Sequence, residues 1–436
     1  MQYLGKILLA SSIIAGTSAQ AVTEINYWLW DQNQPPAYQA CADAFEKQNP
    51  DIKIKITQTG WMNYWDTLAA AFVSGTAPDV FTNHLSRYPE YIQNNLLVDI
   101  APLIAQDKVP TNIYLGGLVT VWGRNGKQYG LPKDWDTIAI VYNKPMLEKA
   151  GIDPKSLTDL NWNPKDGGSF GQLIAKLSVD ANGKTGLDAG FDPKNVKQYG
   201  LLIGGQVDGF GQVEWSHLAV SNGFKFYDAP WATHFHYDDP KLAETIQWIA
   251  DNSLKKGFIV PARDARQAGA NGLFAGQKGA LAFAGSWDIH WLQENCKFDI
   301  GYIHLPKGPV GRRSMFNGLA DSIWVGSKHK EEAWKWVKFL ASPEAQKIVA
   351  EHTVVFPAIP EATELTKQLM QKKGIDVSAY VDEAEDPNGT FLFPITDHAT
   401  DVLRITRAAF DKIYLDGADA ATTLKAANDE VNALFD

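Results

Sequence analysis

Two acidic residues spaced two positions apart are the side chains of this chain best suited to bond-making chemistry. Asp134 and Asp136 lie in the segment 132–136, and in an extended strand the side chains at i and i+2 point to the same side. A pair of carboxylates can supply the acid and the base that cleave a glycosidic bond. The same pair can instead accept hydrogen bonds from ligand hydroxyls. The spacing alone leaves both interpretations open.

Tryptophan is abundant, with 15 residues in 436, and its placement is informative. In open α/β sheets, ligands bind beyond the carboxyl ends of the strands. An indole face suits the C–H face of a sugar ring, while Asp, Asn, Gln and Arg suit its hydroxyls. One group lies at or near predicted strand ends or helix starts: Trp28, Trp30, Trp61, Trp135, Trp215 and Trp287. A second group lies inside regular patterns and is predicted to be core: Trp248, Trp291, Trp324, Trp334 and Trp336.

Signals for a metal are weak. His234 and His236 form an H-x-H pair near two aspartates, but no further ligands follow at metal-binding spacing. Residues 180–184 begin like a calcium loop, yet Phe191 stands where the loop needs its glutamate. A loop and a turn are expected there, with no metal and no cofactor. No H-E-x-x-H or P-loop motif occurs.

Composition and charge exclude several classes of protein. Hydrophobic residues make up 45% and charged residues 21%, which is typical of a globular chain with a core. The net charge is −10 and there is no basic run, so neither nucleic acid nor an anionic membrane surface is an expected partner. The two cysteines, Cys41 and Cys296, cannot form a disulfide framework. Export would permit one disulfide, but two isolated buried thiols are the favoured interpretation.

Residues 1–21 have the features of a secretory signal peptide. Lys6 precedes the apolar run 7–16, which is too short to span a bilayer. Ala19-Gln20-Ala21 puts small residues at the −3 and −1 positions, which predicts cleavage after residue 21. No cysteine follows the apolar run, so a lipid anchor is not expected. The mature chain is therefore predicted to be a soluble periplasmic protein.

Strands and helices alternate along the mature chain, which predicts an α/β fold with a mostly parallel sheet and helices on its faces. No internal repeat or long linker interrupts the pattern, so lobes joined by several crossing strands are expected. The predicted strands are 25–30, 52–57, 79–81, 137–142 and 281–283. The predicted helices are 35–48, 61–74, 145–150, 241–252, 331–340 and one capped by Ser342.

A series of short motifs also occurs in a fixed order. They are the strand 28–31 with residues 44–50 (F-x-x-x-N-P), residues 75–81 (G-x-x-P-D), 94–100, 130–132 with 141–144 (G-x-P…Y-N-K), and 274–287 (ending G-x-W). Together they resemble the extracellular solute-binding proteins of carbohydrate ABC importers, the family that includes maltose-binding protein. The resemblance implies a periplasmic binding protein type II-like fold, with two α/β lobes joined by a crossover hinge around a ligand cleft. Lobe 1 would be 22–134 plus 320–362, and lobe 2 would be 137–317 plus 363–436.

The resemblance also implies which side chains contact the ligand. Arg87 would be a multi-donor clamp for hydroxyls, and Trp287 would stack on a sugar ring. Ser86 stands where the family has an aspartate. The full set implied by the motifs is Trp30, Asp31, Gln32, Trp61, Tyr64, Asn83, Ser86, Arg87, Asp134, Asp136 and Trp287. Packing is an equal alternative for a weaker set: Glu214, Trp215, Asn317, Asp321, Phe391 and Phe393.

By this resemblance the chain would capture a sugar or short oligosaccharide, without catalysis, and deliver it to the transmembrane permease subunits of an ABC importer. A monomer whose lobes close on the ligand is expected. One alternative is a secreted carbohydrate-active hydrolase that uses Asp134 or Asp136. Another is a binding protein of the same fold for a non-sugar solute, such as a polyamine or iron.

Overall fold

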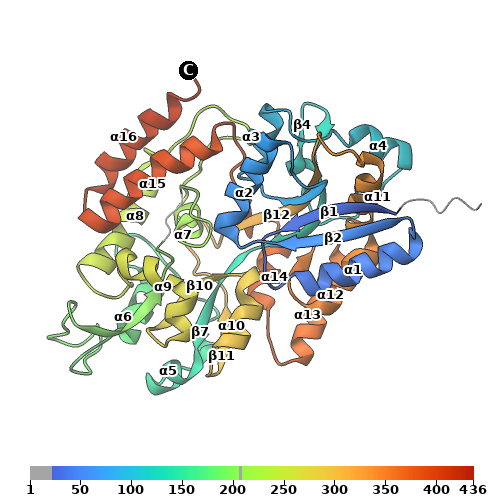
Figure 1. Cartoon of the computed structure of the whole chain (residues 1–436). Coiled ribbons are helices and arrows are strands. Elements are labelled where there is room, and N and C mark those ends of the chain that lie inside the picture. The colour runs from blue at the N-terminus through green and yellow to red at the C-terminus, as the bar shows by residue number, and fades with distance from the viewer. Residues whose placement is uncertain (1–21, 206–208) are drawn as a thin grey trace, which may run out of the picture.

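The structure is a computed structural model that describes residues 22–205 and 209–436. The predicted signal peptide, 1–21, lies outside the described residues. Two sheets, each covered by helices, form the two sides of the molecule (Figure 1). In the described part of the chain, no helix is long and apolar enough to cross a membrane.

The first sheet has the strand order β13-β6-β12-β3-β1-β2, and β14 pairs with β12. These strands are β1 (Thr23–Leu29), β2 (Ile52–Gln58), β3 (Val80–Asn83), β6 (Leu131–Asp136), β12 (Ser314–Ile323), β13 (Phe356–Pro357) and β14 (Thr390–Leu392). Its helices are α1 (Pro35–Gln48), α2 (Trp61–Ser74), α3 (Tyr88–Gln93), α4 (Ala101–Asp107), α11 (Lys330–Leu340), α12 (Pro343–His352) and α13 (Pro360–Lys372). A short hairpin, β4 (Gly123–Arg124) with β5 (Lys127–Gln128), lies beside it.

The first sheet is buried on both of its faces. Ile25, Tyr27 and Leu29 are fully buried in one core with Phe45 of α1, while Phe81 of β3 lies in another core with Leu68 of α2. Figure 1 shows α1 and α2 on opposite sides of β1 and β2. Because both faces are covered, only the strand ends are left to form a site.

The second sheet has the strand order β11-β7-β10-β9-β8. These strands are β7 (Ile138–Asn143), β8 (Val179–Asp180), β9 (Val196–Leu202), β10 (Gly279–Gly285) and β11 (Ile300–Ile303). The helices around it are α5 (Lys144–Lys149), α6 (Gly168–Leu177), α7 (Ser216–Ser221), α8 (Pro240–Leu254), α9 (Ala262–Ala275), α10 (Ile289–Asn295), α14 (Ser378–Glu385), α15 (Ala399–Asp416) and α16 (Ala420–Asn432). α16 packs on α8 and α15, at the far end of the molecule from α1 (Figure 1).

Crossing strands join the two sheets. The chain leaves β6 at Asp136 and enters β7 at Ile138, and it returns from β11 to β12. Ile138 N donates to Ser314 Oγ at 2.8 Å, so the two crossings are hydrogen-bonded to each other. Both crossings therefore lie between the lobes, where the end of β6 faces the space that separates them.

Every predicted strand and helix is present, with small differences at the ends, and Ser342 Oγ accepts from Ala345 N as the predicted cap. The prediction of a mostly parallel sheet is only partly correct. β1 is parallel to β2 and β3, but β12 is antiparallel to β3 and β6, and β7 is antiparallel to β10 and β11. The strands that cross between the lobes return in the opposite direction, which makes both sheets mixed.

Two features bear on the expected lobe boundaries. The boundary at 362/363 falls inside α13, which packs against α12 and β13 of the first sheet. β14 pairs in parallel with residues 314–316 of β12, and both of these segments were expected in lobe 2. Cys41 and Cys296 are buried free thiols, and burial raises the pKa of Cys41 to about 12 and that of Cys296 to about 11.

Candidate functional site

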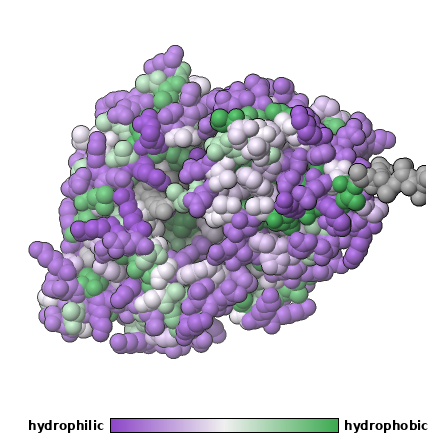
Figure 2. All heavy atoms as spheres, in the orientation of Figure 1, coloured by the Kyte–Doolittle hydropathy of each residue, from purple (hydrophilic) through white to green (hydrophobic). Residues whose placement is uncertain are grey.

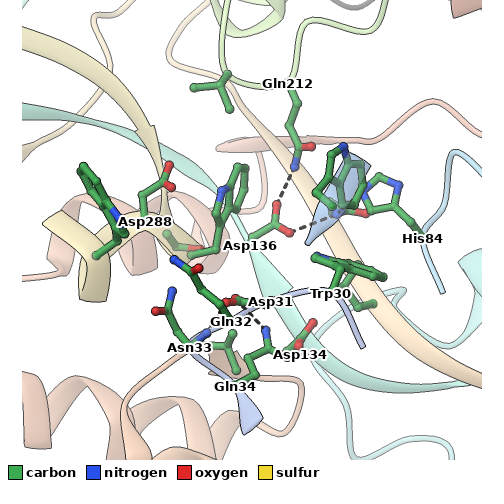
Figure 3. A pocket seen from close by; sticks show the side chains of 18 of the residues that line it. Trp30, Asp31, Gln32, Asn33, Gln34, His84, Asp134, Asp136, Gln212 and Asp288 are labelled. Atoms are coloured by element: carbon green, nitrogen blue, oxygen red, sulfur yellow. Dashed lines mark hydrogen bonds between the residues drawn. The ribbon is translucent and has the colours of Figure 1, made fainter. Parts of the chain in front are cut away.

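A cavity of about 600 Å³ lies between the two lobes. Figure 2 shows a hollow at this place on the molecular surface, and Figure 3 shows the side chains that converge on it. Strand ends and loops of both sheets form its wall: the segment after β1 (Trp30 to Gln34), β6 (Asp134 to Asp136), β12 (Asn317 and Leu319), the segment after β10 (Ser286 to Asp288), and the loop Gln212 to Glu214. The site is therefore at the position where ligands bind in open α/β sheets.

The turn between β1 and α1 is held by Asp31. Its Oδ1 accepts from Asn33 N at 2.8 Å and its Oδ2 accepts from Gln34 Nε2 at 3.1 Å (Figure 3). Burial raises the pKa of Asp31, while these hydrogen bonds oppose the rise. The carboxylate thus fixes the loop that carries Trp30 and Gln32 into the cavity.

Indole rings form the apolar part of the wall. Trp30 packs edge-on against Trp61, with ring centroids 5.1 Å apart, and Trp287 and Trp291 line the cavity from the second lobe. Trp287 lies directly against the backbone of Gly285, where an added Cβ would come within 2.3 Å of the ring. Glycine at this position therefore lets the indole lie against the end of β10.

A hydrogen-bonded chain of polar side chains crosses the cavity wall. Asp136 accepts from Gln212 Nε2 at 2.7 Å and from Asn317 Nδ2 at 3.0 Å (Figure 3). The same Asn317 amide reaches His84 Nε2 at 3.1 Å, and His84 Nδ1 lies 2.8 Å from Ser86 Oγ. The backbone N–H of Ser86 also donates to His84 Nδ1 at 3.1 Å, so both ring nitrogens are engaged. Burial lowers the pKa of His84 to about 3, so the ring is neutral.

Asp134 differs from Asp136, although both lie on β6 and both line the cavity as their spacing predicts. Its Oδ2 is buried and has no hydrogen-bond partner among the described residues. Burial raises the pKa of Asp134 to about 7, and nearby Lys133 opposes the rise. Burial likewise raises the pKa of Asp288 to about 7, although it accepts from Gly285 N at 3.2 Å. An unpartnered acceptor in a cavity wall is suited to a ligand hydroxyl.

Ser86, Arg87 and Phe393 line a neighbouring cavity of about 470 Å³ rather than the first one. Trp61, His84 and Gln212 line both cavities, so the two share a wall. Trp30, Asp31, Gln32, Trp61, Asp134, Asp136, Glu214, Trp287 and Asn317, from the expected set, line the first cavity.

Tyr64, Asn83 and Asp321, from the expected set, line neither cavity. Tyr64 is buried and donates to Thr82 O at 2.7 Å. Asn83 Nδ2 donates to Ser322 Oγ at 3.0 Å, and it is fully buried. Asp321 forms a buried ion pair with Lys133 at 3.3 Å. These three polar side chains hold β1, β3, β6 and β12 together behind the cavity.

Trp215 and Phe391 line neither cavity either. Trp215 is fully buried against Phe226 and Phe410, and Phe391 stacks on the same Phe226. Both are packing residues, and Phe391 packs there from β14 of the first sheet. Trp135 borders the first cavity but is almost fully buried, since its indole stacks on Phe356 and its Nε1 donates to Thr363 Oγ1.

Several residues of the wall were not expected: His84, Gln212, Asn271, Asp288 and Trp291. Trp291 was predicted to be core, which is wrong because it follows Trp287 by one helical turn and lines the same cavity. That i, i+4 spacing is a signal in the sequence that could have identified it. His84 lies between two expected residues, whereas nothing local in the sequence marks Gln212.

No group of three or more potential ligands is close enough to hold a metal ion within residues 22–205 and 209–436. His236 lies 3.7 Å from Asp228 on the surface, and residues 180–184 form a turn in which Asp180 accepts from backbone amides.

Comparison with known proteins identifies the family. The sequence model described as bacterial extracellular solute-binding protein matches residues 30–347. The chain belongs to this family. A curated relative, the arabinooligosaccharide-binding protein of Bacillus subtilis, is 27% identical over 40% of this chain and 42% of its own length. The sn-glycerol-3-phosphate-binding periplasmic protein UgpB of Yersinia pestis is 24% identical over 85% of this chain and 83% of its own.

Solved structures confirm the fold of this solute-binding protein. The ABC substrate-binding protein Lmo0181 from Listeria monocytogenes, solved in complex with cycloalternan, superposes with a TM-score of 0.81. The two chains are 21% identical, and the match covers 95% of this chain and 99% of the other. The two lobes and the crossing strands are therefore a periplasmic binding protein fold.

Proposed function

We propose that this solute-binding protein captures a sugar or short oligosaccharide in the first cavity and delivers it to the permease of an ABC importer. The chemistry of the cavity wall carries the proposal. Indole rings of Trp30, Trp61, Trp287 and Trp291 offer flat apolar faces, and carboxylates and amides surround them. No Lys or Arg lines this cavity among the residues that the structure describes. Such a wall suits neutral rings with many hydroxyl donors.

The unsatisfied atoms point to the same ligand chemistry. Asp134 Oδ2 and Asn317 Oδ1 are buried acceptors without partners among the described residues. Buried acceptors are stable only when a donor reaches them, and sugar hydroxyls supply such donors. Relatives named for arabinooligosaccharide and solved with cycloalternan support a saccharide ligand.

The lobes and their environment complete the proposal. Lobe 1 comprises the first sheet with its helices and lobe 2 the second, and closure over the cavity is what a permease would recognise. The protein works as a monomer in the periplasm, after removal of residues 1–21. The periplasmic protein UgpB of Yersinia pestis, a relative over most of the chain, supports this location.

A thermal-shift screen of neutral oligosaccharides tests the proposal. A ligand at 100 times its dissociation constant should stabilise the protein by about 2.7 kcal/mol. Chromatography of the incubated sugars tests the hydrolase alternative, because cleavage products would assign a catalytic role to Asp134 or Asp136. A screen in which polyamines or ferric ions stabilise the protein and no saccharide does would contradict a sugar ligand.

A pair of tryptophans provides a matched control. Trp287→Ala removes an indole from the cavity and should weaken binding of the best saccharide roughly fivefold to more than a hundredfold, by analogy with stacking on bases. Trp336 is fully buried against Phe45, so Trp336→Ala should cost about 3–5 kcal/mol of stability and leave the affinity of the folded fraction unchanged. Calorimetric titration and melting curves of both variants separate the two roles.

A further inference from the structure

The second cavity differs in charge from the first. Three arginines, Arg87, Arg404 and Arg407, line it, and its one carboxylate, Asp411, forms an ion pair with Arg266. The cavity therefore carries a surplus of positive charge within the described residues. The first cavity, on the other side of the shared wall, carries carboxylates and no cation.

Helix α15 supplies the charged side of this second cavity. The residues that face it are Thr400, Leu403, Arg404, Arg407, Ala408 and Asp411. Their spacing of three and four positions is that of one face of an α-helix. Other residues of α15 are buried against the second lobe, for example Phe410 and Ile413. The helix thus presents a polar, cationic face toward the cleft and an apolar face toward its own core.

The guanidinium groups have free hydrogen-bonding capacity. Arg87 Nε is buried and has no partner among the described residues, and the group lies 5.4 Å from the centre of the Trp65 ring. Among the described residues, Arg407 makes no ion pair. Arg404 forms one ion pair there, with Asp401 at 3.2 Å on the exposed surface. An exposed pair of this kind is weak. All three arginines can therefore donate to a ligand.

The two cavities are direct neighbours, because three residues line both of them. Trp61, His84 and Gln212 belong to both, and neutral His84 adds no charge at the junction. The volumes, about 600 and 470 Å³, together exceed what a pocket for a single small molecule commonly needs. A ligand longer than one sugar ring could occupy both.

We propose that the second cavity binds an anionic group at one end of the ligand, so that the solute is an acidic oligosaccharide. This inference rests on the proposed function, since the neutral part of the same ligand fills the first cavity. The group is an anionic oxygen cluster, either the carboxylate of a uronic acid or a phosphate ester. Guanidinium forks bind both groups through paired N–H donors. The negative charge also sets the direction in which the oligosaccharide binds, because the carboxylates of the first cavity repel its anionic end.

Matched pairs of saccharides test the proposal by calorimetric titration and thermal shift. Trigalacturonate is compared with its methyl ester, and trehalose 6-phosphate with trehalose, so that the two arms distinguish a uronic acid from a phosphate ester. Neutral gluco-, manno- and arabino-oligosaccharides complete the panel. The acidic member of at least one pair should bind at least tenfold more tightly than its neutral partner, and added NaCl should narrow the difference.

Variants locate the effect. Arg404→Gln with Arg407→Gln should weaken the acidic probe roughly tenfold to a hundredfold and leave its neutral partner unchanged. Lys412→Gln is the control, because Lys412 is exposed on the same helix, carries the same charge and does not line the cavity. An equal loss in the control would indicate a general charge effect and would overturn the assignment.

The outcomes also separate this inference from the proposed function. If neutral oligosaccharides bind best and the double variant binds them like the wild type, the acidic subsite is wrong and the sugar-binding function stands. If no saccharide of the panel binds, both are wrong. If an acidic probe binds but the double variant binds it equally well, the anionic group lies elsewhere.

Discussion

Replacing Asp134 by asparagine should make the ligand-free protein more stable at pH 8 while it weakens ligand binding. Asp134 is nearly fully buried, and its Oδ2 has no partner within the described residues. Burial raises its pKa from 3.8 to about 7. At pH 8 the folded protein therefore holds an ionised carboxylate that burial disfavours, and Asp134→Asn removes that charge with almost no change of shape.

The sign and size of the effect follow from linkage. The folded protein binds this proton more tightly than the unfolded chain, so the stabilisation is fully present below about pH 4 and is lost as the pH rises through about 7. A difference of about three pKa units corresponds to up to about 4 kcal/mol. The new amide N–H lacks a partner and costs about 1–3 kcal/mol. The expected result is a net gain of about 1–3 kcal/mol at pH 8 and a net loss of about 1–3 kcal/mol at pH 4, where the carboxyl is neutral and nothing offsets the cost of the amide.

Binding should change in the opposite direction. A charge-assisted hydrogen bond to a ligand hydroxyl is worth about 1.5–3 kcal/mol, so losing it should weaken binding roughly tenfold to a hundredfold. Urea melts between pH 4 and 8 measure stability, and calorimetry at pH 8 measures affinity. Asp79→Asn is the control, because Asp79 lies outside both cavities and accepts from Asn26 N and Ser327 Oγ. It should lower stability and leave affinity unchanged. A stability difference for Asp134→Asn that is the same at pH 4 and pH 8 would refute the reasoning.

Three further predictions concern other parts of the molecule. Gly285→Ala places a methyl group where the Trp287 indole lies and should weaken saccharide binding at least fivefold in calorimetry; unchanged affinity would contradict the stacking role. Arg124 of expected lobe 1 pairs with Asp397 of expected lobe 2 through two hydrogen bonds of 2.6 Å. If this pair holds the lobes together, Arg124→Gln should increase the radius of gyration of the ligand-free protein in small-angle scattering. Identical scattering of the two proteins would contradict that role. Mass spectrometry of the exported protein should show a mature chain that begins at residue 22, whereas a retained Met1 would contradict export through a cleaved signal peptide.

Local patterns predicted the elements and part of the site. Alternation and helical spacing identified β1, α2 and the strand ends, because a buried face must repeat with the period of its element. Trp30, Trp61 and Trp287 were placed at the cleft by the strand-end rule together with the family motifs, and they line the first cavity. What these signals share is that each is visible within a few residues of the side chain itself.

Long-range pairings could not be predicted in this way. The ion pair of Lys133 with Asp321 joins residues 188 positions apart. Tyr27, which also donates to Asp321, is 294 positions away from it in the sequence. The family resemblance points to Asp321 only weakly, and it does not say whether the carboxylate faces the ligand or a lysine. Gln212 likewise reaches Asp136 from a loop with no recognisable pattern. Such contacts depend on how the sheets are assembled, which no local period encodes.

The register of one strand pair decides which carboxylate is left for the ligand. Asp136 lies opposite Asn317 in the antiparallel pair of β6 and β12, and the amide donates to it across the strands. Asp134 lies opposite Leu319, whose side chain has no donor. Directly opposed side chains are the ones that interact across a sheet, so both oxygens of Asp136 receive side-chain donors, whereas Asp134 Oδ2 receives none from the described residues. The i, i+2 spacing places both carboxylates in the cavity, but their different chemistry comes from the residues that β12 sets against them.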